Sequence, residues 1–322
     1  MNIRPELIER VARHRRDTLG TLSDAAYQEL LESVKQDVEN FIDSPEDEAF
    51  RLVVEATERE QASRKDEDLL DDDAFFESRT RRMARLASDC EGALRIDPNC
   101  LDAQLLALLG KDLDPDPTID PLFDVEKNAE ETLAKLAPPE DAWNEVLFRP
   151  LLRIKACLAR TLLDSACYRL AAQKGEEAIA LSPSDPLGAR HTCSLCYARL
   201  EDESSFDSLD VRFSRQGSAW SHLGRALLLY KIDRMPAARR AIKGYARTVE
   251  GGAYALLRPV MVDSYLPGRP ECEPLSYPEA MLAVHEADPI ICDVPDFPSW
   301  AQNQRDLWCS AQDFAQRKGF DW

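Results

Sequence analysis

A self-similarity with a period of about 34 residues constrains this fold more than any other feature of the sequence. Residues 152–185 show it most completely, with small and large apolar residues at helical spacings and a proline at the end. The positions concerned are Leu158, Ala159, Leu162, Tyr168, Ala171, Ala178 and Pro183. Small residues let two helices approach closely, and proline ends the second of them. The segment is therefore predicted to be a pair of antiparallel helices that stacks on similar pairs.

Three other segments fit the same frame in part. Residues 88–104 place Ala93, Pro98 and Ala103 in that frame, and residues 220–227 give the first-helix pattern from Trp220 onward. Residues 186–199 supply a less regular first helix. This pattern is that of the tetratricopeptide repeat. We expect an all-α fold, a tetratricopeptide-like helical-repeat solenoid with a Pro-rich C-terminal wrap. The alternative is an array of antiparallel helices without a repeat.

The segments on either side of the repeats differ from them in composition. Residues 1–72 are predicted to form an N-terminal helical region, in which Ser23 caps one helix and Ser44 begins the next. Residues 73–258 are assigned to the repeats. Residues 259–322 contain eight prolines up to Pro298, and a helical apolar pattern follows from about 302 to 318. We expect this part to wrap over the scaffold and to end in a helix.

Two acidic stretches interrupt the helical pattern. Residues 66–73 (DEDLLDDD) are interpreted as a solvated linker or helix entry, with a helix following from about Ala74 to Ile96. The acids between Asp112 and Asp120 resemble those of a calcium-binding loop. However, Pro117 stands where such a loop needs glycine, and Phe123 stands where it needs glutamate. We therefore expect an acidic loop that does not bind calcium.

The charge of the chain limits its partners. It has 59 Asp and Glu against 40 Lys and Arg, which gives a formal net charge of −19. Residues 1–150 carry a net charge of −18, residues 151–260 of +6 and residues 261–322 of −7. An acidic surface disfavours nucleic-acid binding, because phosphate contacts need cationic faces. The basic segment is expected to receive an acidic chain, from a partner, from a second copy or from this protein's own N-terminal or tail segment.

The repeat frame also predicts a concave binding groove. In a helical-repeat superhelix the first helices line the concave face, and here their groove positions include four arginines. The predicted peptide-binding residues are Arg153, Arg160, Arg190, Ser194, Tyr197, Ser221 and Arg225, with His222 one position away. Arginine can hold a carboxylate with two parallel hydrogen bonds, so we expect the groove to bind an extended acidic peptide. The alternative is that these arginines pair with Asp and Glu of the fold itself.

The cysteines predict reduced thiols. There are nine of them, an odd number, and most lie in helical apolar patterns. Such a chain suits the cytosol better than a disulfide framework, and the charged N-terminus is not expected to be a secretory signal. His191, Cys193 and Cys196 form an H-x-C-x-x-C motif, which can be a redox pair or half of a zinc site. No second Cys-x-x-Cys accompanies it, so packing is the favoured interpretation and no metal ligand is assigned.

In their order along the chain, several motifs resemble a known group. The stretches LFRPLLRIKACLA, SPSDPLGARHTCSL, SAWSHLGRALLLYK and AARRAIKGY, followed by the Pro-rich tail, are similar to bacterial tetratricopeptide-like proteins. That group is related to the animal suppressor-of-tumorigenicity-7 family. The resemblance covers about residues 75–300 and implies an all-helical scaffold. It implies no catalytic residue, because none is established for the family.

Together these features predict a cytoplasmic, non-catalytic scaffold for protein–protein interaction, without a cofactor. The sequence contains no P-loop, G-x-S-x-G or H-E-x-x-H motif, and its four histidines are scattered. No apolar run is long enough to cross a membrane. Two alternatives stay open. One is a metal- or thiol-dependent protein that uses His191, Cys193 and Cys196, and the other is an acidic mimic of nucleic acid that uses residues 1–150.

Overall fold

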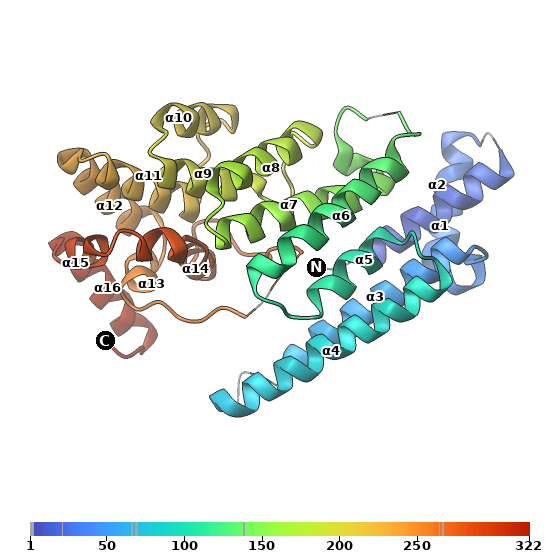
Figure 1. The fold of residues 1–322 in the computed structure, drawn as a ribbon, viewed down its shortest axis with the longest axis horizontal. Coiled ribbons are helices and arrows are strands. Elements are labelled where there is room, and N and C mark those ends of the chain that lie inside the picture. The colour runs from blue at the N-terminus through green and yellow to red at the C-terminus, as the bar shows by residue number, and fades with distance from the viewer. Residues whose placement is uncertain are drawn as a thin grey trace. The chain divides into compact units, whose positions relative to one another are not determined.

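The fold is described by a computed structural model for residues 3–20, 22–65, 67, 70–137, 139–263, 265 and 267–322. These residues form sixteen α-helices and short 3-10 helices, and they contain no β-strand (Figure 1). The predicted all-α class is therefore confirmed. By its internal contacts the chain divides into two units, which we call unit 1 and unit 2. Unit 1 comprises Met1–Cys157, Leu181–Pro186 and Leu266–Gly268, and unit 2 comprises Leu158–Ala180, Leu187–Tyr265 and Arg269–Trp322.

Unit 1 contains the first six α-helices and the beginning of the seventh. They are α1 (Arg4–Leu19), α2 (Asp24–Gln36), α3 (Pro45–Arg64), α4 (Asp72–Ile96), α5 (Leu101–Leu109), α6 (Pro115–Leu133) and α7 (Arg149–Asp164). Short 3-10 helices lie at Val38–Phe41, Ala142–Asn144 and Val146–Phe148. The long helices α3 and α4 run side by side, and α5 packs against both. Leu7, Val11, Phe50 and Val53 are at most 1% exposed and form the centre of the core between α1 and α3.

The helix starts in unit 1 follow from local side chains. The Ser23 hydroxyl accepts from the N–H of Ala26, and the Ser44 hydroxyl accepts from the N–H of Asp47, so both predicted N-caps are confirmed. Asp71 caps α4 in the same way by accepting from the N–H of Ala74. The second half of the DEDLLDDD stretch is thus a helix entry, as predicted, whereas Asp66, Asp68 and Leu69 lie outside the described residues.

The predicted acidic loop at Asp112–Asp120 is wrong in its second half. Helix α6 begins at Pro115, and Pro117 also lies in its first turn. Proline is tolerated there because the first backbone N–H groups of a helix have no intrahelical acceptor. The Thr118 hydroxyl donates to the carbonyl of Asp114, which adds a bond across this turn. Asp116 and Asp120 are therefore on the helix and not in a loop.

Unit 2 contains helix pairs followed by the Pro-rich segment and three further helices. After the second half of α7 come α8 (Tyr168–Leu181), α9 (Ala189–Leu200), α10 (Glu203–Arg212), α11 (Ala219–Lys231), α12 (Met235–Thr248), α13 (Gly252–Leu257), α14 (Tyr277–Cys292), α15 (Asp296–Gln302) and α16 (Arg305–Lys318). Helix α11 packs against α9, α12 and α14, and α16 packs against α12 and α13. The predicted last helix is therefore present, and it begins three residues later than the pattern indicated.

The turns within the pairs share one backbone geometry. A residue with positive φ lies between α7 and α8, between α9 and α10 and between α11 and α12. These residues are Ala166 (58°), Glu201 (61°) and Asp233 (56°). In each turn the N–H of the next residue donates to the carbonyl five positions earlier. The three bonds are Cys167 to Leu162 (2.8 Å), Asp202 to Tyr197 (3.0 Å) and Arg234 to Leu229 (2.9 Å). This is the bond of a Schellman C-cap, here without the glycine that usually supplies it.

The two units do not coincide with the predicted domains 1–72, 73–258 and 259–322. Helix α4, assigned to the repeats, packs along α3 in unit 1. The division falls instead inside α7, between Cys157 and Leu158. In unit 2, α14 of the Pro-rich part packs on α11. The tail is thus part of the unit 2 core, which a boundary at residue 258 does not capture.

Candidate functional site

Arg153 is a buried ion-pair residue of unit 1. Its side chain is 1% exposed, and it donates to Glu6 with two bonds of 2.9 Å and to Asp102 with one of 2.8 Å. Arg10 contacts the same two carboxylates at 2.6 and 2.8 Å. Burial alone would raise the pKa of Glu6, but the charges of Arg153 and Arg10 hold it at about 2. Arg153 thus pairs with acids of the fold itself, which was the alternative to peptide binding. Because its side chain is buried, a partner cannot reach it.

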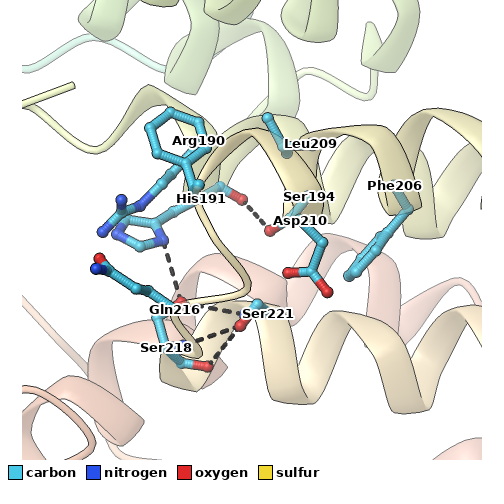
Figure 2. Close-up of a pocket in the computed structure, with 10 residues that line it drawn as sticks. Arg190, His191, Ser194, Phe206, Leu209, Asp210, Gln216, Ser218 and Ser221 are labelled. Atoms are coloured by element: carbon cyan, nitrogen blue, oxygen red, sulfur yellow. Dashed lines mark hydrogen bonds between the residues drawn. The ribbon is translucent and has the colours of Figure 1, made fainter. Parts of the chain in front are cut away.

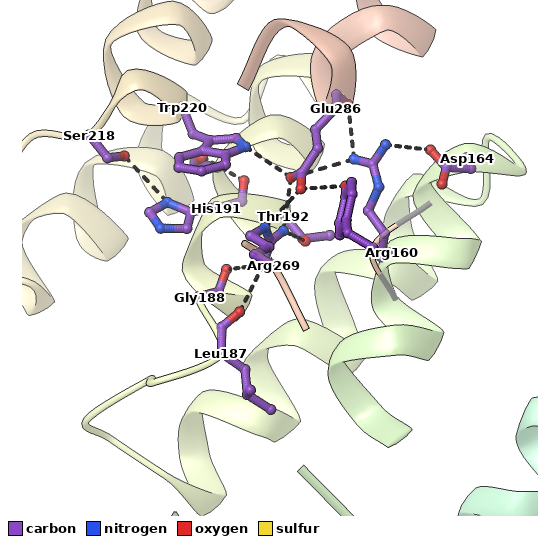
Figure 3. Close-up of polar contacts among 12 residues, drawn as sticks. Arg160, Asp164, Leu187, Gly188, His191, Thr192, Ser218, Trp220, Arg269 and Glu286 are labelled. Carbon is purple, nitrogen blue, oxygen red and sulfur yellow. Dashed lines mark hydrogen bonds and ion pairs between the residues drawn. The ribbon is translucent and has the colours of Figure 1, made fainter. Parts of the chain in front are cut away.

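Arg160 is the second buried arginine of the predicted groove. It lies in the unit 2 half of α7 with 6% of its side chain exposed. It donates to the Asp164 carboxylate at 2.7 Å and to the Glu286 carbonyl at 3.0 Å, and it lies 3.6 Å from the Glu286 carboxylate (Figure 3). Like Arg153, it is engaged by the fold and is not available to a peptide.

Glu286 is the centre of the polar contacts in unit 2. Its side chain is fully buried on α14 and accepts hydrogen bonds from Trp220 Nε1 at 2.9 Å and from the Tyr265 hydroxyl at 2.6 Å (Figure 3). Arg269 donates two more bonds, at 2.8 and 2.9 Å. Burial would raise the pKa of Glu286, but the charges of Arg269 and Arg160 and these hydrogen bonds hold it at about 2. The carboxylate is therefore ionised and fully satisfied.

Arg269 ties the Pro-rich segment to α9. Besides Glu286, its guanidinium donates to the carbonyls of Leu187 (2.9 Å) and Gly188 (2.8 Å) and to the Thr192 hydroxyl (2.8 Å), as Figure 3 shows. Gly188 has a φ of 68°, and a Cβ there would lie 2.6 Å from the His191 ring. Arg269 was not predicted as a functional residue from the sequence. Its only signal was a basic residue in a Pro-rich stretch, which does not reveal five backbone and side-chain acceptors.

A small pocket lies between α9, α10 and α11 of unit 2 (Figure 2). It is lined by Arg190, His191, Ser194, Phe206, Leu209, Asp210, Phe213, Gln216, Ser218 and Ser221. Three predicted site residues, Arg190, Ser194 and Ser221, thus come together here. The cavity volume is about 20 Å³, which is room for about one water molecule. A metabolite-sized ligand does not fit this space, since such pockets usually measure about 300–1,000 Å³.

Local contacts fix the polar side chains of the pocket. The Ser218 hydroxyl accepts from the N–H of Ser221, and the Ser221 hydroxyl accepts from the N–H of Ser218, which forms a capping box at the start of α11. The His191 ring stacks on Trp220 with centroids 4.1 Å apart, and its Nδ1 lies 3.3 Å from the Ser218 hydroxyl. Burial and the nearby charge of Arg269 lower the pKa of His191 well below its usual value, so the ring is neutral. Arg190 lies over the Phe213 ring, 4.8 Å from its centroid.

The remaining predicted residues do not line this pocket. The Tyr197 hydroxyl donates to Glu176 at 2.8 Å. Arg225 pairs with Asp207 at 2.6 Å and lies over the Phe206 ring at 4.2 Å. His222 is half-buried against Gly217, where a Cβ would lie 2.5 Å from its Nε2. The predicted set is therefore split between two buried ion-pair arginines, three pocket residues and three neighbours.

The H-x-C-x-x-C motif is not assembled as a ligand set. Cys193 and Cys196 are fully buried, and the Cys193 thiol lies 3.7 Å from the Ala172 carbonyl on α8. A Cβ at Gly175 would lie 2.4 Å from the same sulfur, so this glycine makes room for Cys193. Burial raises the pKa of Cys196 to about 12. His191 faces the pocket instead, and so the packing interpretation describes these residues.

Unit 1 contains a group of potential ligands that the sequence analysis did not single out. Ligand atoms of His14, Asp43 and Asp47 lie within 4.8 Å of one another. His14 Nδ1 is 3.0 Å from Asp47, and Arg15 pairs with Asp43 at 2.8 Å. Asp47 lies in the first turn of α3, where the helix dipole favours an anion and opposes a cation. We therefore interpret these three side chains as polar contacts that link α1 to the start of α3.

Comparisons with protein-family models, with curated proteins and with solved structures gave no match to this chain. None of the described helices is both long and apolar enough to cross a membrane.

Proposed function

We propose that this protein is a non-catalytic interaction module built from tetratricopeptide-like helix pairs, and that it binds an extended acidic segment of a partner at the α9–α11 pocket. The observation that carries this proposal is the convergence of Arg190, Ser194 and Ser221 on one pocket, as the repeat spacing indicated. The common turn geometry of the three helix pairs supports the repeat.

The chemistry of the pocket suits the end of an acidic side chain. Arg190 offers hydrogen-bond donors to a carboxylate, and Phe206 and Phe213 offer apolar walls to its methylene groups. The Asp210 carboxylate, which also lines the pocket, pairs with Arg225 at 3.4 Å. Because the cavity has room for about one water molecule, the proposed carboxylate lies at its mouth beside Arg190. Arg153 and Arg160 have no part in this site, because both are buried in ion pairs.

The test is binding of a fluorescein-labelled, extended peptide rich in Gly, Ser and Glu, measured by fluorescence anisotropy. Arg190→Ala should weaken the binding about tenfold, because one charge-assisted contact is lost. Arg169→Ala is the matched control, since Arg169 is an exposed arginine of α8 that does not line the pocket. Equal affinities of wild type and Arg190→Ala, or an equal loss in the control, would contradict the proposal.

A further inference from the structure

Helix α12 carries a basic face. Its fourteen residues, Met235–Thr248, include four cations and no Asp or Glu. The cations are Arg239, Arg240, Lys243 and Arg247. At about 100° per residue they fall within one sector of roughly 100°, and they span about 12 Å along the axis. Ala238, Ile242 and Tyr245 are buried on the other side. The basic face is therefore the exposed side of an amphipathic helix.

Three acids near α12 pair with cations outside the basic face. Arg234 pairs with Glu203 at 2.7 Å, Lys231 with Glu201 at 3.4 Å and Lys318 with Glu250 at 3.6 Å. Asp306 of α16 pairs with Lys243 at 2.7 Å. Among the residues that the structure describes, no carboxylate forms an ion pair with Arg239, Arg240 or Arg247, and all three are exposed. Three arginines of a strongly acidic protein thus face solvent together.

Gly244 lies beside this face and has no packing reason to be glycine. A Cβ at this position would have no heavy atom within 4 Å. Glycine inside a helix costs about 1 kcal/mol relative to alanine. It leaves a bare strip of backbone next to Arg240 and Arg247, along which another chain can approach closely.

We propose that this basic face of α12 is a docking surface for an acidic helical segment of a partner protein. Glutamates that repeat every four residues on a helix face the same way and match the spacing of Arg239, Lys243 and Arg247. Charge complementarity supplies the attraction, and it is strongest at low salt. None of these residues lines the α9–α11 pocket, so the inference does not depend on the function proposed above.

The surface fits a protein segment better than other polyanions. A nucleic acid extends far beyond about 12 Å and would meet the field of a chain with net charge −19. An anionic membrane would need apolar side chains beside the cations, and the only other residues between Arg239 and Arg247 that are not buried are Ala241 and Gly244. An acidic helix needs only the row of cations that is present.

The experiment uses the full chain and a labelled, Ala-rich helical peptide with glutamates at every fourth position. The variant Arg239→Glu/Arg240→Glu/Arg247→Glu should bind it at least about tenfold more weakly than wild type, because three attractive contacts become repulsive. The matched control is Arg85→Glu/Arg95→Glu/Lys127→Glu, which changes the net charge equally at exposed positions of unit 1. A second control peptide has the same composition with its glutamates distributed around the helix. Circular dichroism melting verifies that each variant is folded.

The proposal predicts loss in the α12 variant alone, retention in the Arg190→Ala variant, and preference for the peptide with aligned glutamates. It is overturned if both triple variants lose binding equally, since the effect is then one of net charge. It is also overturned if single-stranded DNA or phosphatidylserine vesicles bind more tightly than the peptide through these arginines. Wild-type dimers that the α12 variant cannot form would identify a second copy as the occupant instead.

Discussion

At the scale of single residues, Glu286 makes unit 2 sensitive to acid. Its pKa is about 2 in the fold against an ordinary 4.5, so its contribution to stability is complete above the ordinary value. That contribution is lost as the pH falls from about 5 to 2, because protons then bind the unfolded chain first. We expect the free energy of unfolding in urea to decrease over this range.

The variant Glu286→Gln tests this assignment. It leaves Arg160 and Arg269 buried with less neutralising charge, so it should cost about 3–5 kcal/mol at pH 7. It should also flatten the dependence of stability on pH below 5. Glu250→Gln, at an exposed position, is the control and should do neither. An unchanged pH profile in Glu286→Gln would show that other carboxylates cause the acid lability.

The thiols provide a second test at this scale. Cys193 and Cys196 are fully buried, whereas Cys167, Cys292 and Cys309 are exposed. Because reaction requires an accessible thiolate, a disulfide reagent at pH 8 should modify the exposed three in the native protein and reach the other two only after unfolding. Mass spectrometry of digested samples locates the modified residues. Rapid native modification of Cys193 or Cys196 would restore the thiol-dependent alternative.

The sequence placed arginines on helices but could not tell which of them are buried. Arg153 and Arg160 each have an acceptor from far along the chain, 147 residues away for Glu6 and 126 for Glu286, although Asp164 lies only four residues from Arg160. Local spacing carries no information about such contacts. Arg190, Ser194 and Ser221 lie together because all three are on α9 and α11, which pack directly against each other.

At the scale of elements, the turn between α7 and α8 contains an unfavourable residue. Ala166 is exposed and has a φ of 58°, a region that costs a non-glycine residue about 1 kcal/mol. Ala166→Gly should therefore raise the free energy of unfolding by roughly 0.5–1 kcal/mol. Gly244→Ala in the middle of α12 should also stabilise the fold by a similar amount, because alanine favours the helical conformation more than glycine does. Urea denaturation measures both, and a destabilised Ala166→Gly would contradict the described turn.

Arg269 makes several of the hydrogen bonds that attach the Pro-rich segment to unit 2. Arg269→Ala removes the bonds to Glu286, Leu187, Gly188 and Thr192, so residues 259–276 should be cut by proteases about tenfold faster. Arg269→Lys should behave almost as the alanine variant, because the ammonium group of lysine lacks the planar set of donors with which the guanidinium reaches all of these acceptors at once. Arg169→Ala is the control on α8. Equal cleavage rates in all four proteins would show that other contacts hold the segment.

Helix starts and turns were predictable, whereas the division into units was not. Ser23, Ser44 and Pro45 act within one turn of helix, so their effect is visible in the sequence. The acids near Pro115 led to the prediction of a loop, although α6 begins at this proline, which is favourable in the first turn of a helix. The pairing of α3 with α4, and of α14 with α11, depends on apolar faces that many helices share. No local pattern distinguishes these partners.

At the scale of the whole molecule, the net charge of −19 acts as self-repulsion. The buried pairs around Arg153 and Glu286 are little screened by salt, whereas exposed acids are screened over a Debye length of about 10 Å at 0.1 M. Raising NaCl from about 20 to 200 mM should therefore increase the melting temperature by roughly 2–5 °C. Differential scanning calorimetry measures this change. The Arg85→Glu/Arg95→Glu/Lys127→Glu variant, which is more acidic, should show a larger increase. A melting temperature that falls with salt would mean that exposed ion pairs outweigh the repulsion among the acids of residues 1–150.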